Sequence, residues 1–274
     1  MKKLFIICII IMLVCVAALI IYILSGHDDS LTLREYRFKT DKLTGGVKIA
    51  FVSDLHGTEF GEYNSRLVEM IKQSEPDLVF LGGDIFDRKD HIEQGKSLIS
   101  QLTPFYPVYG VMGNHEYYTS GYDPIEIKRI YRELGVTLLE NGHTTFELDG
   151  GNINICGADP FVGDAHWQEN TVEGADRDNY TVVINHRPDQ WTEFTDKDVD
   201  LMLSGHAHGG QWRVPGLING VLAPNQGFFP KYAGGLYEFE DGMNLVVSRG
   251  LALSRVPRVY NPPELVVIKI ESDR

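Results

Sequence analysis

Acids, histidines and one asparagine recur in this chain at the same kind of place, directly after short apolar runs. The segment "IAFVSDLHG" places Asp54 and His56 after such a run, "LVFLGGD" places Asp84, and "VYGVMGNHE" places Asn114 and His115. Carboxylate oxygens, imidazole nitrogens and amide oxygens are ligands of divalent cations in proteins. The residue types therefore indicate metal chemistry.

Two later segments continue this pattern. "TVVINH" ends in His186, and "LMLSGHAHGG" contains His206 and His208 between glycines. Taken alone, each such residue has a structural alternative, because Asp and Asn form turns or cap helices and a histidine can bond within a core. Five segments together favour one shared site, since buried acids and histidines need partners and here would have each other.

The collected side chains are numerous enough for two ions. They are Asp54, His56, Asp84, Asn114, His186, His206 and His208. The donor set lacks thiolate, which suits Mn, Zn or Fe, and we favour Mn or Zn. If Asp84 serves both, two ions about 4 Å apart could polarise a phosphoryl group and generate hydroxide from water. His115 would then act as general acid or hold phosphoryl oxygens, and the glycines around His206 and His208 would leave room for the phosphate.

The apolar runs that carry these residues are typical of β-strands, being rich in Val, Ile and Phe and bounded by Gly, Pro and Asn. Helical spacing of apolar residues between strands, in 62–74 and 124–135, predicts parallel sheet in the first half. From about residue 214 the helical signal fades, and a hairpin turning at Asp241–Gly242 predicts more antiparallel strands. Ligand sites of α/β sheets lie at strand carboxyl ends, so the five segments should meet there.

The first residues form a different kind of segment. Residues 4–24 contain no charge and follow Lys2 and Lys3. A helix needs about 20 apolar residues to span a bilayer, whereas the apolar part of a cleaved signal has at most about 15. We therefore expect a single-pass signal anchor at 1–24, a linker at 25–30 and one α/β domain at 31–274. The lysines favour a cytoplasmic N-terminus, which puts the domain on the outer face of the cell membrane. A removed signal peptide is the alternative.

The charge of the chain restricts its partners. The formal net charge is −13 at pH 7, and it becomes −15 without Lys2 and Lys3. Such a surface repels phosphate backbones, so we expect no nucleic-acid partner. Nothing in the sequence implies a protein partner.

The order of the motifs carries a resemblance. D-x-H, G-D, G-N-H-E, a lone His and G-H-x-H resembles the pattern of the calcineurin-like metallophosphoesterases over roughly residues 47–210. The later segments "KYAGGLYEF", "VVSRGLALS" and "NPPELVVIKI" resemble the membrane-anchored bacterial phosphodiesterases of that superfamily. The resemblance implies a four-layer αββα sandwich, two mixed sheets flanked by helices, after the transmembrane helix. It assigns one ion to Asp54, His56, Asp84 and His208, and the other to Asp84, Asn114, His186 and His206.

The resemblance also implies an activity. We expect a dinuclear metal-dependent phosphoesterase, foremost a phosphodiesterase, in which metal-bound hydroxide attacks phosphorus in a lipid-linked or cell-wall phosphoester. One alternative is the hydrolysis of a nucleotide-linked lipid pyrophosphate such as UDP-diacylglucosamine, as in some relatives. Another is a non-catalytic metal-binding scaffold, which the complete ligand set disfavours. The sequence leaves open whether monoesters or diesters are preferred.

Three further residues have open roles. Glu116 either orients His115 or is a surface residue. Asp87 either orients a ligand or caps the helix that follows it. Arg249 either binds the substrate phosphate or forms an ordinary surface ion pair.

Overall fold

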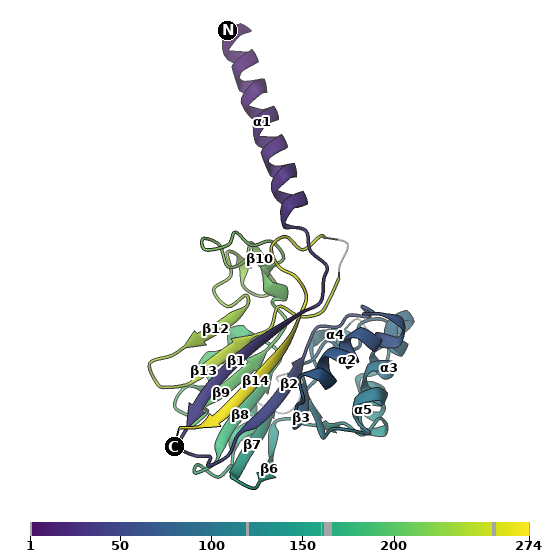
Figure 1. The fold of residues 1–274 in the computed structure, drawn as a ribbon, viewed down its shortest axis with the longest axis vertical. Coiled ribbons are helices and arrows are strands. Elements are labelled where there is room, and N and C mark those ends of the chain that lie inside the picture. Colours follow the sequence, from purple (N-terminus) through teal and green to yellow (C-terminus); the bar gives the residue numbers. More distant parts are fainter. Residues whose placement is uncertain (1, 119–120, 160, 162–165, 254–255, 274) are drawn as a thin grey trace.

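Two six-stranded mixed sheets form the centre of the molecule (Figure 1). They belong to a computed structural model that describes residues 2–118, 121–159, 161, 166–253 and 256–273. The sheets confirm the predicted α/β class, and the strands come from the short apolar runs singled out in the sequence.

The first sheet supplies three of the strands that lead into polar segments. Its spatial order is β1 (Thr32–Thr40), β14 (Glu264–Ser272), β2 (Val47–Val52), β3 (Leu78–Leu81), β4 (Val108–Gly110) and β5 (Thr137–Leu138). Strands β2 to β5 run parallel, whereas β14 is antiparallel to β2. The carboxyl ends of β2, β3 and β4 therefore share one edge.

The second sheet supplies the other two strands that lead into polar segments. Its order is β12 (Gly235–Glu238), β13 (Asn244–Val247), β9 (Leu201–Ser204), β8 (Tyr180–Asn185), β7 (Gly151–Ala158) and β6 (Gly142–Leu148). The predicted hairpin at Asp241–Gly242 is present as β12–β13. Antiparallel pairing is confined to the edges of this sheet, and its middle strands run parallel. The prediction of more antiparallel strands from about residue 214 agrees with the β12–β13 hairpin and with the antiparallel pairing of β14 with β2, although β13 also pairs in parallel with β9.

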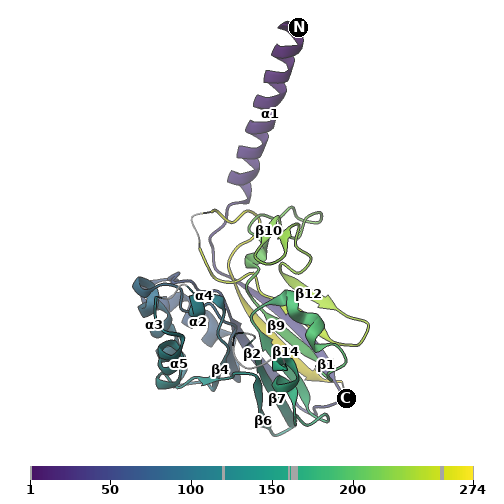
Figure 2. The same cartoon turned by 180° about the vertical axis from the view of Figure 1, so that it is seen from behind.

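Apolar side chains define four layers. Residues such as Phe51, Phe80 and Ile184 fill the space between the sheets. The outer face of the first sheet is covered by α2 (Ser65–Gln73), α3 (Ile92–Leu102) and α5 (Pro124–Glu133), seen beside the sheets in Figure 2. The outer face of the second sheet carries a thinner layer, α6 (Trp167–Val172) and the 3₁₀ segment Pro188–Phe194. This arrangement confirms the predicted αββα sandwich.

The N-terminal helix α1 (Lys2–Gly26) projects from this body (Figure 1). It ends two residues beyond the predicted segment, and by length and composition Lys3–Gly26 could cross a membrane. Its last turn contacts the body, because the Tyr22 hydroxyl donates to the Arg213 carbonyl and the Tyr260 N–H donates to the Gly26 carbonyl. The short hairpin β10 (Leu222–Ala223) and β11 (Gly227–Phe228) lies at this end of the body.

Candidate dinuclear metal centre

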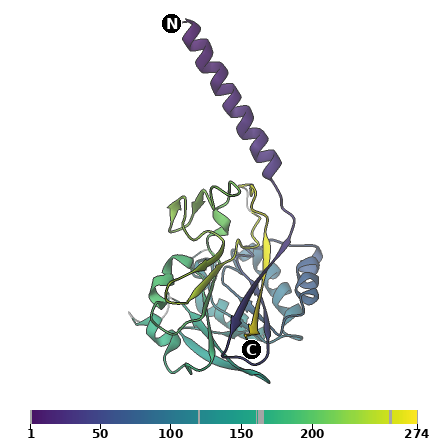
Figure 3. The same ribbon diagram turned by 60° about the vertical axis from the view of Figure 1, so that its left-hand side comes forward.

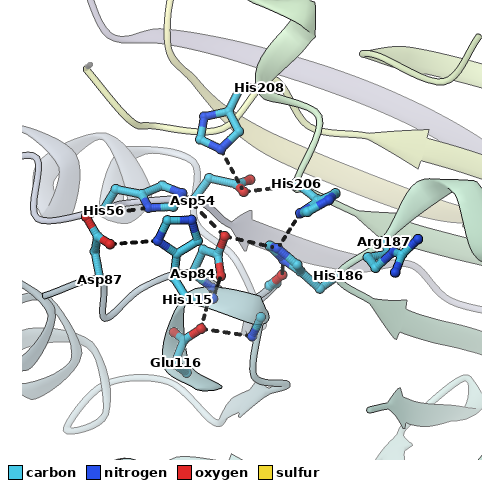
Figure 4. A network of polar contacts seen from close by, with 12 residues as sticks. Asp54, His56, Asp84, Asp87, His115, Glu116, His186, Arg187, His206 and His208 are labelled. Atoms are coloured by element: carbon cyan, nitrogen blue, oxygen red, sulfur yellow. Dashed lines mark hydrogen bonds and ion pairs between the residues drawn. The ribbon is translucent and has the colours of Figure 1, made fainter. Parts of the chain in front are cut away.

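The five predicted polar segments meet where strands of both sheets end (Figure 4). The loops after β2 and β3 carry Asp54 and Asp84, and the short helix α4 (Asn114–Tyr118) begins shortly after β4. From the second sheet, His186 directly follows β8, and the loop after β9 carries the last two histidines. The site therefore lies at the edge of the sandwich that the parallel strand ends share.

The first group of side chains surrounds one position. Single ligand atoms of Asp54, His56, Asp84 and His208 all lie within 4.8 Å of one another. His56 Nε2 is 3.4 Å from Asp84 Oδ2, and His208 Nε2 is 3.6 Å from Asp54 Oδ1. These four residues are the set that the family resemblance implied for one ion.

A second group adjoins the first. Ligand atoms of Asp84, His186 and His206 also lie within 4.8 Å of one another. His186 Nε2 is 3.1 Å from Asp84 Oδ2 and 3.2 Å from His206 Nδ1. Because Asp84 belongs to both groups, its carboxylate has the position of a bridging ligand.

Several buried atoms at the site have no hydrogen-bond partner among the described residues. They are Asp54 Oδ2, His56 Nε2, Asn114 Oδ1 and His208 Nδ1. A buried polar atom without a partner costs about 1–3 kcal/mol. Divalent cations would satisfy oxygen and imidazole atoms arranged in this way, so the residues present fit a pair of metal ions.

The charges of the two central carboxylates also favour bound cations. Asp54 and Asp84 are 0% and 1% exposed. Burial by itself would raise the pKa of Asp84, but His186, together with His56 and His115, outweighs it and holds that pKa well below its usual range. The pKa of Asp54 is likewise lowered, against burial, by His208 and His186. Two adjacent negative charges in a dry site need positive charge close by.

The backbone at these positions is in an unusual conformation. Asp54, His56, Asp84, His206 and His208 have φ values of 52°, 46°, 53°, 65° and 48°. Non-glycine residues seldom adopt this left-handed region, which costs of order 1–3 kcal/mol per residue. The sharp turns direct the side chains away from the strand path and toward one point. Strain of this kind clusters at functional sites.

Glycines allow the polar segments to approach one another. A Cβ atom on Gly113 would lie 2.2 Å from Asp84 Oδ1, and one on Gly205 would lie 2.3 Å from Asp54 Oδ2. A Cβ on Gly209 would lie 2.0 Å from Asn261 Oδ1. The expectation that the glycines around His206 and His208 leave room for a phosphate was therefore wrong for Gly205 and Gly209, which make room for protein side chains.

His115 lies beside the first group and is held by Asp87. The Nδ1 atom of His115 is 2.6 Å from Asp87 Oδ1, and its backbone N–H donates to Asp84 Oδ1 at 2.8 Å. Its ring packs edge-on against His56 with centroids 4.3 Å apart. Burial lowers the pKa of His115, but the hydrogen bond to Asp87 and the nearby charges of Asp84, Asp87 and Glu116 together outweigh it, so that pKa is raised above its usual value. Of the two roles considered for Asp87, the contact supports orientation.

Glu116 is fully buried and fixes the loop after β3. Its carboxylate accepts hydrogen bonds of 2.8 to 3.0 Å from the backbone N–H groups of Asp84, Ile85, Phe86 and Gly113 and from the Tyr131 hydroxyl. The sequence left open whether Glu116 orients His115 or is a surface residue, and its burial shows that the surface role was wrong. The structure gives it contacts with the backbone that presents Asp84.

Arg249 forms an ion pair, as the second alternative supposed, but the pair is largely buried and not on the surface, since the Arg249 side chain is 16% exposed. Its Nε atom lies 3.4 Å from Glu264 Oε2, and the Glu264 side chain is 1% exposed. The sequence leaves an ion pair and a phosphate contact equally open, and the observed neighbour is the ion-pair partner.

Two asparagines at the site were missed. Asn225 Oδ1 lies 2.7 Å from His206 Nε2, and Asn261 Nδ2 donates to the His208 carbonyl at 2.8 Å. Both occupy loops after the last motif, Asn225 in "APNQG" and Asn261 in "YNPPE". No spacing rule connects these loops to the histidines.

The comparisons with known proteins identify a phosphoesterase family. The sequence profile of the family described as calcineurin-like phosphoesterase matches residues 47–210. The metallophosphoesterase YkuE of Bacillus subtilis is 30% identical over 83% of this chain and 80% of its own length. The phosphodiesterase YaeI of Escherichia coli is 28% identical over 81% and 82%. The solved structure of phosphopantetheinyl hydrolase PptH from Mycobacterium tuberculosis has a TM-score of 0.45 at 16% identity, covering 76% of this chain and 91% of that one.

Replacing Glu116 should test how the site is built. We expect Glu116→Gln to lower the free energy of unfolding of the metal-free chain by about 2–3 kcal/mol, because an amide N–H₂ would face backbone donors in place of a carboxylate oxygen. Urea denaturation in detergent solution measures this. The control Glu133→Gln, on α5 with its side chain 59% exposed, should change the value by less than about 0.5 kcal/mol. Equal effects of both variants would contradict the assignment.

Proposed function

The chain belongs to the calcineurin-like phosphoesterase family, and we propose that it is a dinuclear metal-dependent phosphodiesterase acting on a membrane- or wall-associated substrate. Membership of the family makes it a phosphoric ester hydrolase. One observation carries the dinuclear proposal: two adjoining groups of ligand atoms share the buried carboxylate of Asp84.

The proposed ligand sets follow the two groups. One ion would be held by Asp54, His56, Asp84 and His208, and the other by Asp84, Asn114, His186 and His206. The unpaired Oδ1 of Asn114 supports its inclusion in the second set. The oxygen and nitrogen donors favour Mn or Zn. When bound, two such ions polarise a phosphoryl group and lower the pKa of the attacking water.

His115 is the proposed general acid. Its Nδ1 lies 2.6 Å from Asp87 Oδ1, and its Nε2 would deliver a proton to the oxygen that leaves phosphorus. The carboxylate of Asp87 favours the protonated ring and fixes its orientation, so Asp87 is a positioning residue. A general acid needs its proton at working pH, and the raised pKa of His115 supports that role.

Membrane association is proposed from the N-terminal segment. We take residues 1–24 as a single-pass anchor, 25–30 as a linker and 31–274 as the catalytic domain. The two lysines before the apolar segment favour an outward-facing domain. An anchored site could reach phosphodiesters of lipids or of the wall. The negative charge of the domain disfavours nucleic acid as a substrate.

Removing the shared ligand should cost more metal than removing an unshared one. We expect two equivalents of bound Mn²⁺ in the full chain, one in His206→Ala and less than one in Asp84→Asn, because only the second change affects both positions. Elemental analysis after gel filtration measures the ratio. The control His143→Ala, on the edge strand β6, should keep both ions. Normal metal content and turnover in Asp84→Asn and His206→Ala would refute the dinuclear site.

Removing His115 should affect catalysis and not metal binding. We expect His115→Ala to lower kcat by roughly 10²–10⁴-fold, the usual contribution of general acid catalysis, with the metal content unchanged. Asp87→Asn should lower kcat less and shift the basic limb of the pH profile to lower pH, because the ring loses the carboxylate that favours its protonated form. If His115→Ala instead lost metal, His115 would be a ligand.

A comparison of two ester substrates tests the activity itself. We expect the Mn²⁺-loaded full chain in detergent to have a higher kcat/KM on bis-p-nitrophenyl phosphate than on p-nitrophenyl phosphate. The name of the E. coli relative, a phosphodiesterase, supports this direction. A monoester preference would overturn the diesterase proposal. Two bound metals without activity on either ester would favour a scaffold, unless a nucleotide-linked lipid pyrophosphate such as UDP-diacylglucosamine were cleaved.

A further inference from the structure

An apolar surface lies beside the end of α1. It consists of residues 211–233, which include the β10–β11 hairpin, together with Val256, and we call it the hairpin surface. Five of its large apolar side chains are exposed, by 47% to 81%: Leu217, Leu222, Phe228, Phe229 and Val256. Single exposed apolar residues are ordinary on soluble proteins, but a contiguous group of them marks a contact surface.

The hairpin surface is hollowed by an apolar groove. The groove has a volume of about 580 Å³, and Trp212, Val221, Leu222, Pro224, Phe228 and Val256 line it. Gly210 and Gln211, which directly follow the segment with His206 and His208, also line it. The turn of the hairpin carries Asn225, whose Oδ1 lies 2.7 Å from His206 Nε2. The groove therefore adjoins the candidate metal centre.

Contacts with α1 show where the hairpin surface lies along the axis of that helix. The hydroxyl of Tyr22 donates to the carbonyl of Arg213, and the ring of Tyr22 packs against Tyr260 with centroids 5.1 Å apart. Tyr22 precedes the end of α1 by four residues, or about 6 Å at 1.5 Å per residue. If α1 crosses a bilayer, the start of the hairpin surface lies at the depth of its last turn. Figures 1 and 3 both show β10 or its hairpin at the α1 end of the body.

The charge of this part of the chain differs from that of the rest. No Asp or Glu occurs between Asp200 and Glu238, although the chain contains 38 acidic residues. The charged residues of the hairpin surface are Arg213 and Lys231, both basic. An acid-free apolar surface with two cations is compatible with a headgroup layer, which the acidic remainder of the domain would avoid.

We infer that the hairpin surface enters the headgroup and outer acyl region of the bilayer, with its groove open to lipid. The inference rests on the proposed anchoring by α1. Lipid is favoured as the occupant because the contacts of Tyr22 place this surface, and not another face of the domain, at the end of the apolar helix. Such a position would hold the metal centre within reach of lipid phosphoesters.

Quenching of tryptophan fluorescence by brominated phosphatidylcholine tests this position. The full chain would be reconstituted in nanodiscs as Phe229→Trp, whose side chain does not line the groove, and the quenching of the unsubstituted chain would be subtracted. Phe105→Trp is the matched control, since Phe105 is 65% exposed against 67% for Phe229 and precedes β4 at the amino end of the sheet. Leu13→Trp, in the middle of α1, reports the anchor. Leu217→Trp repeats the measurement at a second position.

We expect bromolipid to quench Leu13→Trp, Phe229→Trp and Leu217→Trp, and Phe105→Trp several-fold less. If only Leu13→Trp were quenched, α1 would be inserted and the hairpin surface would not be, which overturns the inference and leaves the anchoring intact. Aqueous iodide would then show whether water or a second protein copy covers the surface. If Leu13→Trp were not quenched, the anchoring and the inference would both fail. Equal quenching at Phe105→Trp would also overturn it.

Discussion

The site depends on holding two buried carboxylates, Asp54 and Asp84, side by side. Each is almost fully buried, and an unpaired buried charge is far more costly than a buried neutral group. Neighbouring side chains reduce the cost of burying these two charges. The rings of His186 and His208 approach the carboxylate oxygens, and unpaired ligand atoms remain for cations. The same negative charge that would destabilise an empty site gives it affinity for divalent ions.

The loops that carry these carboxylates and histidines have an unfavourable backbone conformation, and the packing of the sandwich compensates for its cost. Left-handed turns at the strand ends raise the energy of the loops, whereas the strands before them are buried on both faces, by the core between the sheets and by the cores beneath the outer helices. Glu116 links the loop to the rest of the sandwich, because its carboxylate accepts hydrogen bonds from the Asp84 loop, from the backbone of Gly113 and from the Tyr131 hydroxyl. A rigid sheet edge with a precisely bonded loop is the form in which a preorganised site is usually built.

The side chains around the candidate metal centre come from different elements on its different sides. Asp87 and His115 lie on the side of the first sheet, beside His56. Asn225 reaches His206 from the hairpin between β9 and β12. The proton-handling residues and the apolar groove thus approach the ligand groups from different elements, and the groove belongs to the part of the body that contacts α1. A substrate with a phosphoester head and an apolar tail would suit this division.

The sequence by itself determined the candidate ligand residues, the α/β class and the apolar N-terminal helix, because each rests on local patterns. Strand ends, apolar periodicity and motif order can all be recognised in the sequence. Only the tertiary structure decided the partners of Glu116, the ion pair of Arg249, the contact of Asn261 with the histidine loop, and the side chains that fill the space beside Gly205 and Gly209. Such contacts join distant segments, as when the His206 N–H donates to Asp54 across 152 positions. No spacing in the sequence encodes them, since they arise only when the two sheets pack face to face.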